Sequence, residues 1–323
     1  MHKVSKISVL GAGSWGTAVA LLLARQGHLV TLWSKNISYL DCENKKYLPG
    51  INFPNNLLVT DNLKHALDTD YLLIAVPSHA FLDLIAQIPN VPKHGIAWLT
   101  KGIEPISYRL FSNILLEKYG PIPLAMISGP SFAKEVAMQK PTAMLVASNN
   151  ELLQKKWQAL MHSQYNRIYL SNDLIGVQIC GAIKNVLAIA CGISDGLSYG
   201  ANARAALITR GLNEMVTLGK SLGATEQTFY GLAGVGDLVL TCTDNQSRNR
   251  RFGLYIGQGD SITSATDKVA QVVEGLHNAK QTATLAQQNQ VEMPICTAVY
   301  SVISGVQTAA QAAASLMARD LNY

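Results

Sequence analysis

Short apolar runs alternate with longer segments of helical periodicity through the first half of the chain. Six of these runs have the length and composition of buried strands, at residues 7–10, 29–33, 71–76, 96–99, 124–127 and 143–147. Helical patterns lie between several of them, at residues 14–25, 80–88, 110–119 and 151–162. Continuous apolar strands that alternate with helices are typical of a mainly parallel sheet covered by helices, with right-handed crossovers.

The pattern changes after about Ser171. Alanine- and leucine-rich helical segments then follow one another, at residues 173–193, 201–219, 275–288 and 308–317. A length of 323 residues is enough for about two domains. We therefore predict an α/β domain with a doubly wound, mainly parallel sheet at residues 1–172, and an all-helical domain at residues 173–323.

The first predicted strand runs directly into a glycine-rich turn. Gly11, Gly13 and Gly16 form a complete GxGxxG pattern, and a helical pattern begins at Ser14. In such a turn the first glycine permits the tight bend, the second lets a pyrophosphate approach the backbone, and the third lets helix and strand pack closely. Free N–H groups at the start of the helix favour the phosphates. This context predicts a Rossmann-type dinucleotide site rather than a turn without a ligand.

The residues after the second strand bear on which dinucleotide binds. Sites that prefer NAD usually place an acidic residue about 20 residues beyond the first glycine. Here that position is occupied by Ser34, Lys35 and Asn36, and the next acid is Asp41. Lys35 is suited to bind a 2′-phosphate, which favours NADP and leaves NAD open. The alternative is that Lys35 is an ordinary surface lysine.

Lys184 lies in the middle of an almost wholly apolar helix. No residue at helical spacing around it, from Val177 to Cys191, carries a compensating charge. Burial disfavours the charged form of a lysine, so Lys184 must find a partner elsewhere or lose its proton more easily. A lysine with a pKa near the working pH is suited to exchange a proton with a carbonyl oxygen. We predict this catalytic role, against the alternative of a lysine that reaches the surface or pairs with a distant acid.

Two polar clusters in the second half are ambiguous from their pattern alone. Asp237 ends the glycine-rich segment 231–237, where it would orient Lys184, bind a substrate hydroxyl, or simply cap a helix. Residues 247–251 read Ser-Arg-Asn-Arg-Arg, which brings many hydrogen-bond donors together. The planar fork of arginine matches phosphate oxygens. The alternative for this cluster is a solvated, basic helix start.

Composition and charge exclude several classes of protein. The chain is 48% hydrophobic with a net charge of +5, which is typical neither of a disordered chain nor of a nucleic-acid binder. The longest apolar runs, Thr17–Ala24 and Val186–Ile193, are far shorter than the roughly 20 residues that span a membrane. The five cysteines lack CxxC spacing, and the seven histidines lack metal-ligand spacing. We expect a cytoplasmic protein with reduced thiols and no bound metal.

The motifs taken together are those of a known family. In order along the chain they are GAGSWGTA at 11–18, KGIE at 101–104, SGPSFAKEV at 128–136, GAIKNVLAIA at 181–190, GLAGVGDLVLTC at 231–242, SRNRRFG at 247–253 and VVEG at 272–275. On these motifs the chain resembles the bacterial, soluble, NAD(P)-dependent glycerol-3-phosphate dehydrogenases. The resemblance implies a homodimer that interconverts dihydroxyacetone phosphate and sn-glycerol 3-phosphate, the backbone of glycerophospholipids.

The resemblance also implies roles for individual residues, with Lys184 as the proton donor and acceptor. The residues implied to contact the substrate are Lys101, Gly129, Ser131, Asp237, Ser247, Arg248 and Asn249. Those implied to contact the cofactor, beside the three glycines of the turn, are Ser14, Trp15, Lys35, Lys101, Ala133, Arg248, Val272 and Glu274. We expect arginine at position 35 in many relatives, so the lysine there leaves the strength of the NADP preference open.

Two other interpretations compete with this one. A dehydrogenase of the β-hydroxyacid or 6-phosphogluconate type would share the Rossmann domain and the helical second domain, but the segment before Asp237 and the cluster 247–249 disfavour it. A dinucleotide-sensing regulator without turnover would leave Lys184 unexplained. The favoured hypothesis predicts a small phosphorylated partner, and neither a nucleic acid nor insertion into a membrane.

Overall fold

The computed structural model describes residues 4–319, which form two compact units. The first unit comprises the residues up to Thr100 together with Phe111–Leu174, and the second comprises Lys101–Leu110 together with the residues from Ile175 onward. The main division therefore falls two residues beyond the predicted one. The segment 101–110, which the pattern places in the first domain, belongs to the second unit, where Lys101 forms an ion pair with Asp237.

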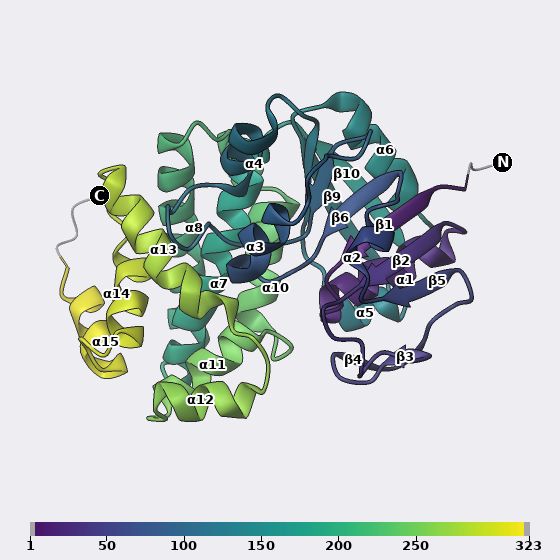
Figure 1. Ribbon diagram of the computed structural model, residues 1–323. Coiled ribbons are helices and arrows are strands. Elements are labelled where there is room, and N and C mark those ends of the chain that lie inside the picture. The colour runs from purple at the N-terminus through teal and green to yellow at the C-terminus, as the bar shows by residue number, and fades with distance from the viewer. Residues whose placement is uncertain (1–3, 320–323) are drawn as a thin grey trace. The chain divides into compact units, whose positions relative to one another are not determined.

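An eight-stranded sheet organises the first unit (Figure 1). Its strands are β1 (Lys6–Leu10), β2 (Leu29–Trp33), β5 (Leu57–Thr60), β6 (Tyr71–Ile74), β7 (Ile96–Trp98), β8 (Leu124–Ser128), β9 (Thr142–Ser148) and β10 (Asn166–Ser171). Their spatial order is β10-β9-β8-β7-β6-β1-β2-β5. The strands from β8 to β5 are parallel and have the order of a Rossmann sheet, which confirms the predicted fold of this half.

The other end of the sheet is not parallel to this core. β9 pairs antiparallel with β8, and β10 lies parallel to β9. The pattern alone favours a parallel partner, but a parallel partner needs a crossover that is usually a full helix, and the connection from β8 to β9 contains only the five-residue helix α5 (Ala133–Ala137). The sequence pattern also does not predict β5, β10, or the small antiparallel pair formed by β3 (Glu43–Asn44) and β4 (Leu48–Asn52).

Helix α1 (Ser14–Arg25) has the bounds that the pattern predicts. All its residues from Gly16 to Ala24 are buried, and those from Ala18 onward belong to the apolar core of the sheet, so the helix is fixed directly behind the glycine-rich turn. The remaining helices of this unit are α2 (Leu63–Ala66), the 3₁₀ turn η1 (Ser78–Ala80), α3 (Phe81–Ala86), α4 (Phe111–Tyr119), α5 and α6 (Glu151–Met161).

Within the described part of the second unit every regular element is a helix, which confirms the all-helical prediction. The elements are α7 (Leu174–Gly196), α8 (Gly200–Ser221), α9 (Glu226–Phe229), the π-helical turn η2 (Leu232–Gly236), α10 (Asp237–Thr243), α11 (Arg248–Gly257), α12 (Ile262–Val269), α13 (Glu274–Gln288), α14 (Pro294–Ile303) and α15 (Ala309–Met317). The pattern predicts α7, α8, α13 and α15. The helices that the pattern misses have ten residues or fewer, and so few turns give little periodicity.

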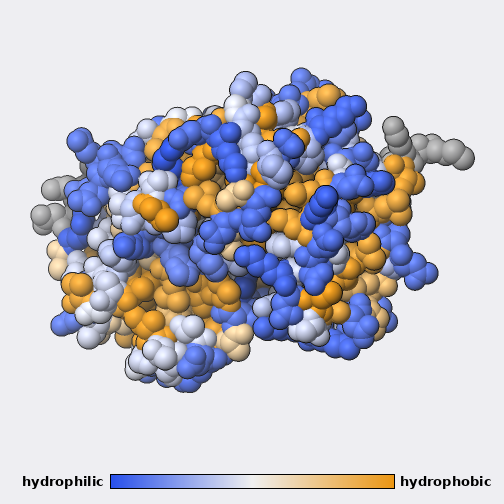
Figure 2. Space-filling view, viewed as in Figure 1, coloured by the Kyte–Doolittle hydropathy of each residue, from blue (hydrophilic) through white to orange (hydrophobic). Residues whose placement is uncertain are grey.

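Helix α7 is the core of the second unit. It has 23 residues and is long and apolar enough to cross a membrane, which the search for unbroken apolar runs does not reveal because Lys184 and Asn185 interrupt it. Of its most apolar stretch 94% is buried inside the protein, as in the core helix of a soluble protein. On the face of the molecule in Figure 2, hydrophilic and hydrophobic residues are interspersed, as on an ordinary folded surface.

Glycines let α11 pack closely on α7. A Cβ at Gly192 of α7 would overlap the carbonyl oxygen of Arg250, and a Cβ at Gly253 of α11 would overlap that of Ile189. Such contacts need glycine because the two backbones touch. They place the beginning of α11, with the predicted anion-binding cluster, beside the middle of α7, with the predicted catalytic lysine.

Candidate functional site

The turn after β1 is shaped by close backbone packing. Gly11 has φ +127°, and a Cβ there would lie 2.6 Å from the carbonyl carbon of Ala75, directly after β6. A Cβ at Gly16 would overlap the carbonyl oxygen of Gly11. The fold itself therefore requires these two glycines. β1 and β6 are the neighbouring strands at which the strand order reverses, the usual place for a dinucleotide in such sheets.

Gly13 differs from the other two glycines. A Cβ there would meet no atom within 4 Å, so internal packing does not require glycine at this position. Gly13 caps α1 without a side-chain hydrogen bond, which leaves N–H groups of the first turn available to an anion. The buried indole Nε1 of Trp15 also has no hydrogen-bond partner among the described residues. Open space, free donors and an unpaired buried N–H fit a bound pyrophosphate.

A buried asparagine that the sequence analysis misses braces this turn. The Asn44 amide donates to the carbonyl oxygen of Ala12 at 2.9 Å and to Oγ1 of Thr17 at 2.8 Å, and its Oδ1 accepts from the N–H of Tyr47 at 2.9 Å. The hydroxyl of Ser14 donates to the carbonyl oxygen of Tyr47 at 2.8 Å. Because the hydroxyl hydrogen is used in this way, Ser14 would donate to a ligand through its backbone N–H. A lone asparagine 27 residues from Thr17 gives no signal in the sequence.

The remaining predicted residues of the first unit follow other parallel strands. Lys35 comes after β2 and is exposed, and Gly129, Ser131 and Ala133 come after β8. The hydroxyl of Ser131 donates to the carbonyl oxygen of Gly129 at 2.9 Å, and Gly129 has φ +127°. Because β1, β2 and β8 run in the same direction, all these residues lie at the carboxyl edge of the sheet, where ligands bind in this fold.

In the second unit, the buried lysine of α7 is paired with an acid. Nζ of Lys184 lies 2.5 Å from Oδ1 of Asp237, the first residue of α10, and 3.0 Å from Oγ1 of Thr241. Lys184 is 6% exposed and Asp237 1% exposed. Lys184 therefore does not reach the surface but pairs with an acid distant in the sequence, and Asp237 contacts the lysine, as one of its three alternatives expects.

A second lysine completes this cluster. Nζ of Lys101 lies 2.6 Å from Oδ2 of Asp237, so one carboxylate accepts from two ammonium groups. Burial lowers the pKa of Lys184 to about 7; the charge of Asp237 opposes this effect and that of Lys101 adds to it. Burial acts to raise the pKa of Asp237, but the two lysines outweigh it and hold that pKa below its usual value. Lys184 can therefore gain and lose a proton near neutral pH while Asp237 stays charged.

Thr241 is a site residue that the sequence analysis does not single out. Its hydroxyl accepts from Lys184 and donates to the backbone carbonyl oxygen of Asp237 at 2.6 Å. The position four residues after Asp237 is a weak signal, because it places Thr241 on the same face of a helix.

The basic cluster at the start of α11 divides into residues with different tasks. Arg250 is 8% exposed and pairs with Asp195 at 2.5 Å, so it is part of the internal structure. Arg248 is half-buried and makes no hydrogen bond or ion pair with any described residue. Burial lowers the pKa of Arg248, the nearby charge of Glu274 raises it, and Arg251 lowers it further. A half-buried guanidinium without a partner is suited to an anionic ligand.

The neighbours of Arg248 are hydrogen-bonded within the protein. The hydroxyl of Ser247 accepts from the N–H of Arg250 as the N-cap of α11. The Asn249 amide donates to Oδ1 of Asn185 at 2.9 Å and accepts from the N–H of Gly275 at 2.9 Å. Asn249 therefore ties α11 to α7 and to the start of α13.

The last two residues predicted to contact the cofactor, Val272 and Glu274, lie next to the hydrogen bond between Asn249 and Gly275. Glu274 is the first residue of α13, next to the Gly275 that Asn249 holds, and its charge acts on Arg248. Val272 comes just before the helix and is 42% exposed, so its side chain is accessible to a ligand.

Other chemistries find little support in the described part of the chain. No three or more His, Cys, Asp or Glu side chains gather there in a way that would hold a metal ion. The five cysteines are free thiols, and Cys42 alone among them is exposed.

Comparison with known proteins identifies the same family in both halves of the chain. The N-terminal model of NAD-dependent glycerol-3-phosphate dehydrogenase matches residues 6–154, and the C-terminal model matches residues 173–314. The glycerol-3-phosphate dehydrogenase [NAD(P)+] of Legionella pneumophila is 57% identical over 320 residues, 97% of each chain. That of Pseudoalteromonas translucida is 48% identical, over 98% of this chain and 97% of the relative.

Solved structures agree with this result. The crystal structure of glycerol-3-phosphate dehydrogenase from Coxiella burnetii has a TM-score of 0.94 and 46% identity, and covers 98% of this chain and 99% of its own. A ketopantoate reductase from Ralstonia eutropha, at 13% identity and a TM-score of 0.60, shares the fold alone. The competing interpretations of the sequence are thereby set aside. The chain belongs to the family of NAD-dependent glycerol-3-phosphate dehydrogenases and is an NAD(P)-dependent oxidoreductase.

Proposed function

We propose that this protein interconverts dihydroxyacetone phosphate and sn-glycerol 3-phosphate, with Lys184 as the group that exchanges the proton. The observation that carries the proposal is the cluster of Lys101, Asp237 and Lys184, in which a buried lysine with a pKa near 7 is held by a single carboxylate. The names of the relatives supply the substrate.

The first unit would hold the dinucleotide. The N–H groups at the start of α1 would bind its pyrophosphate in the open space at Gly13, and Trp15 would offer its unpaired indole N–H. Lys35 and Ala133 lie on the same edge of the sheet, where they would flank the rest of the cofactor, and Gly129 and Ser131 lie on that edge beside the proposed substrate. When bound, the reduced nicotinamide supplies the hydride that the carbonyl carbon receives.

The second unit would hold the substrate by its anionic end. Arg248 is the first residue of α11 and an unpaired cation, so it would bind the phosphoryl group, with the remaining donor of Ser247 beside it. Asn249 would fix α11 and α13 through its two hydrogen bonds to Asn185 and Gly275, and the second N–H of its amide would be a further donor to the substrate. Binding energy from the phosphoryl group would then orient the ketone for reaction.

Lys184 would complete the reaction at the oxygen atom. During reduction, negative charge grows on the carbonyl oxygen, and the ammonium of Lys184 would stabilise that charge and transfer one proton to it. During oxidation, neutral Lys184 would take the hydroxyl proton. Asp237 and Thr241 would keep Nζ in position throughout, because both contact it directly.

A spectrophotometric assay tests this function. NADPH and NADH consumption would be followed with dihydroxyacetone phosphate and, as a matched control, with unphosphorylated dihydroxyacetone. We expect rapid consumption with the phosphorylated ketone and a kcat/KM lower by several orders of magnitude with the other. Equal rates with the two ketones, or consumption with neither, would contradict the proposal.

We further propose that the enzyme acts as a cytoplasmic homodimer that supplies glycerol 3-phosphate for phospholipid synthesis. Free thiols support a reducing compartment. The resemblance to bacterial family members supports the dimer and the metabolic role. Sedimentation equilibrium of the purified protein tests the dimer, and a single species at the mass of one chain would contradict it.

A further inference from the structure

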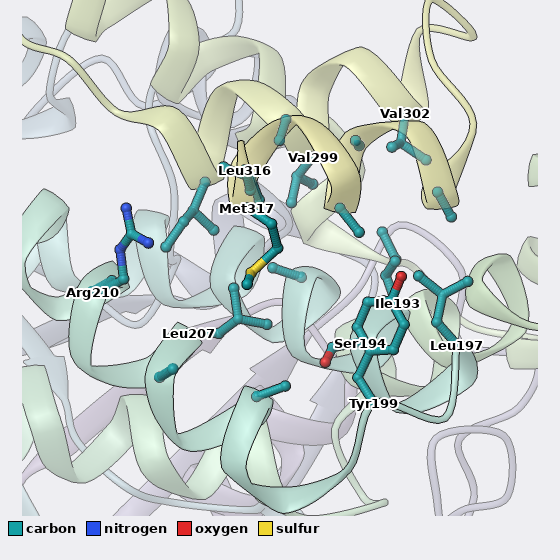
Figure 3. A pocket seen from close by; sticks show the side chains of 18 residues that line it. Ile193, Ser194, Leu197, Tyr199, Leu207, Arg210, Val299, Val302, Leu316 and Met317 are labelled. Carbon is teal, nitrogen blue, oxygen red and sulfur yellow. The ribbon is translucent and has the colours of Figure 1, made fainter. Parts of the chain in front are cut away.

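We propose that the helical unit has a second ligand site, which binds the alkyl chain of a medium-chain carboxylate. A cavity of about 150 Å³ lies among α7, α8, α14 and α15 (Figure 3). Eighteen residues line it, and all but Ser194, Tyr199 and Arg210 are apolar. None of them belongs to the cluster around Lys184 or to the anion-binding start of α11.

Small side chains create this cavity. Seven of the lining residues are alanines, at positions 190, 203, 206, 298, 309, 312 and 313. A cavity of about 150 Å³ with apolar walls is large enough for a small hydrocarbon. It opens to solvent, because Tyr199 is 51% exposed and Met317 is 84% exposed at its edge. A slot of this size suits one thin chain, whereas a stable protein partner would need a contact surface of roughly 1,000 Å².

The head group of the proposed ligand is inferred from one cationic residue, Arg210. Arg210 lies at one end of the lining side chains in Figure 3, and Ser194 and Tyr199 lie toward the other end. The guanidinium of Arg210 makes no hydrogen bond or ion pair with any described residue. The acid on which its charge acts, Glu214, accepts from the N–H groups of Ile295 and Cys296 and is thereby committed to α14. An apolar slot that ends at a free guanidinium is complementary to an alkyl chain with a carboxylate head.

The probe is sodium octanoate, titrated calorimetrically into the full-length protein. Acetate, which has the head without the chain, and 1-octanol, which has the chain without the charge, are the matched controls. We expect saturable binding of octanoate, weaker binding of octanol and none of acetate. Arg210→Gln should weaken octanoate by about threefold to tenfold and leave octanol unchanged, since a hydrogen-bonded charge contributes about 1 kcal/mol or more. Arg167→Gln, which removes an exposed positive charge from β10, should change neither.

Filling the slot tests its position. Ala298→Phe should abolish binding of both octanoate and octanol, and Ala206→Leu, a smaller change, should weaken both if the first variant does not fold. The proposal is overturned if octanoate does not bind, or if it binds equally well to the filled and unfilled proteins. It is also overturned if sedimentation shows a dimer that Ala298→Phe dissociates, because the slot would then be covered by a second copy of the chain.

Discussion

The ammonium group of Lys184 and the carboxylate of Asp237 are 2.5 Å apart, although 53 residues separate them in the chain. Helix α7 surrounds the lysine with apolar residues, and α10 presents the carboxylate at its first position. Lys101 occupies the other carboxylate oxygen. The proton affinity of Lys184 is therefore set by burial and by two charges of opposite sign, each of which can be removed separately.

Removing the ammonium group should stop the chemical step. We expect Lys184→Met to lower kcat by roughly two to four orders of magnitude, the usual contribution of a positioned proton donor. The affinity for NADPH, measured by fluorescence titration, should stay essentially unchanged because the proposed cofactor residues of the first unit are untouched. Turnover close to the wild-type rate would show that Lys184 is not the proton donor.

The pH dependence of the reaction should follow the pKa of Lys184. Reduction needs the protonated lysine, so kcat should fall as the pH rises through about 7, while oxidation of the alcohol should rise through the same range. Lys101→Met removes a charge that lowers this pKa and should move the fall to higher pH. Asp237→Asn removes a charge that raises it and should move the fall to lower pH.

Opposite shifts in these two variants would be the signature of charge control. They are measured as kcat profiles in both directions, on protein whose fold is verified by circular dichroism, since breaking a buried pair is costly. If the pH profiles of both variants shifted in the same direction, or did not shift, Lys184 would not be the group that titrates in the reaction.

Arg248 and Arg250 should separate binding from stability. Arg248→Gln should raise KM for dihydroxyacetone phosphate by roughly two orders of magnitude, as when a buried charge loses its partner, and leave the midpoint of thermal unfolding almost unchanged. Arg250→Gln should lower the free energy of unfolding by about 1 to 2 kcal/mol, because Asp195 loses one of its two arginine partners and keeps Arg204. The measurements are steady-state kinetics and denaturant unfolding. A raised KM in Arg250→Gln together with a loss of stability in Arg248→Gln would mean that Arg250 binds the substrate and Arg248 stabilises the fold.

The glycines of the turn should also differ from one another. Gly13→Ala places a methyl group in open space, so the free energy of unfolding should fall by less than about 1 kcal/mol. The same methyl group would obstruct a bound pyrophosphate, and the Kd for NADPH should rise by roughly tenfold or more. Gly16→Ala should destabilise the fold by about 3 kcal/mol or more, since its Cβ would overlap Gly11. A Gly13→Ala enzyme with normal cofactor affinity would place the pyrophosphate elsewhere.

Local patterns were sufficient for the part of the fold that depends on neighbouring residues. The turn from β1 into α1 follows from residues 7–25, because strand, glycines and helix are contiguous there. The direction of β9 and the brace from Asn44 depend on chain segments that meet only after folding, and no local pattern encodes them. Motif resemblance suggested which residues of the second half share a site, but the partner of Lys184 became visible only when α10 was placed against α7.

Lys35 should determine which dinucleotide is preferred. It is exposed after β2, at the edge of the sheet where the cofactor is proposed to bind, and no acid precedes Asp41. Lys35→Glu would replace attraction for a 2′-phosphate by repulsion, and each of these two changes is worth up to about 1 kcal/mol, so the ratio of kcat/KM for NADPH to that for NADH should fall by roughly threefold to tenfold. Lys93→Glu makes the same change of charge before β7, at the opposite edge of the sheet, and should leave the ratio unchanged. Equal effects of the two substitutions would mean that net charge alone, and not a phosphate contact at Lys35, governs the preference.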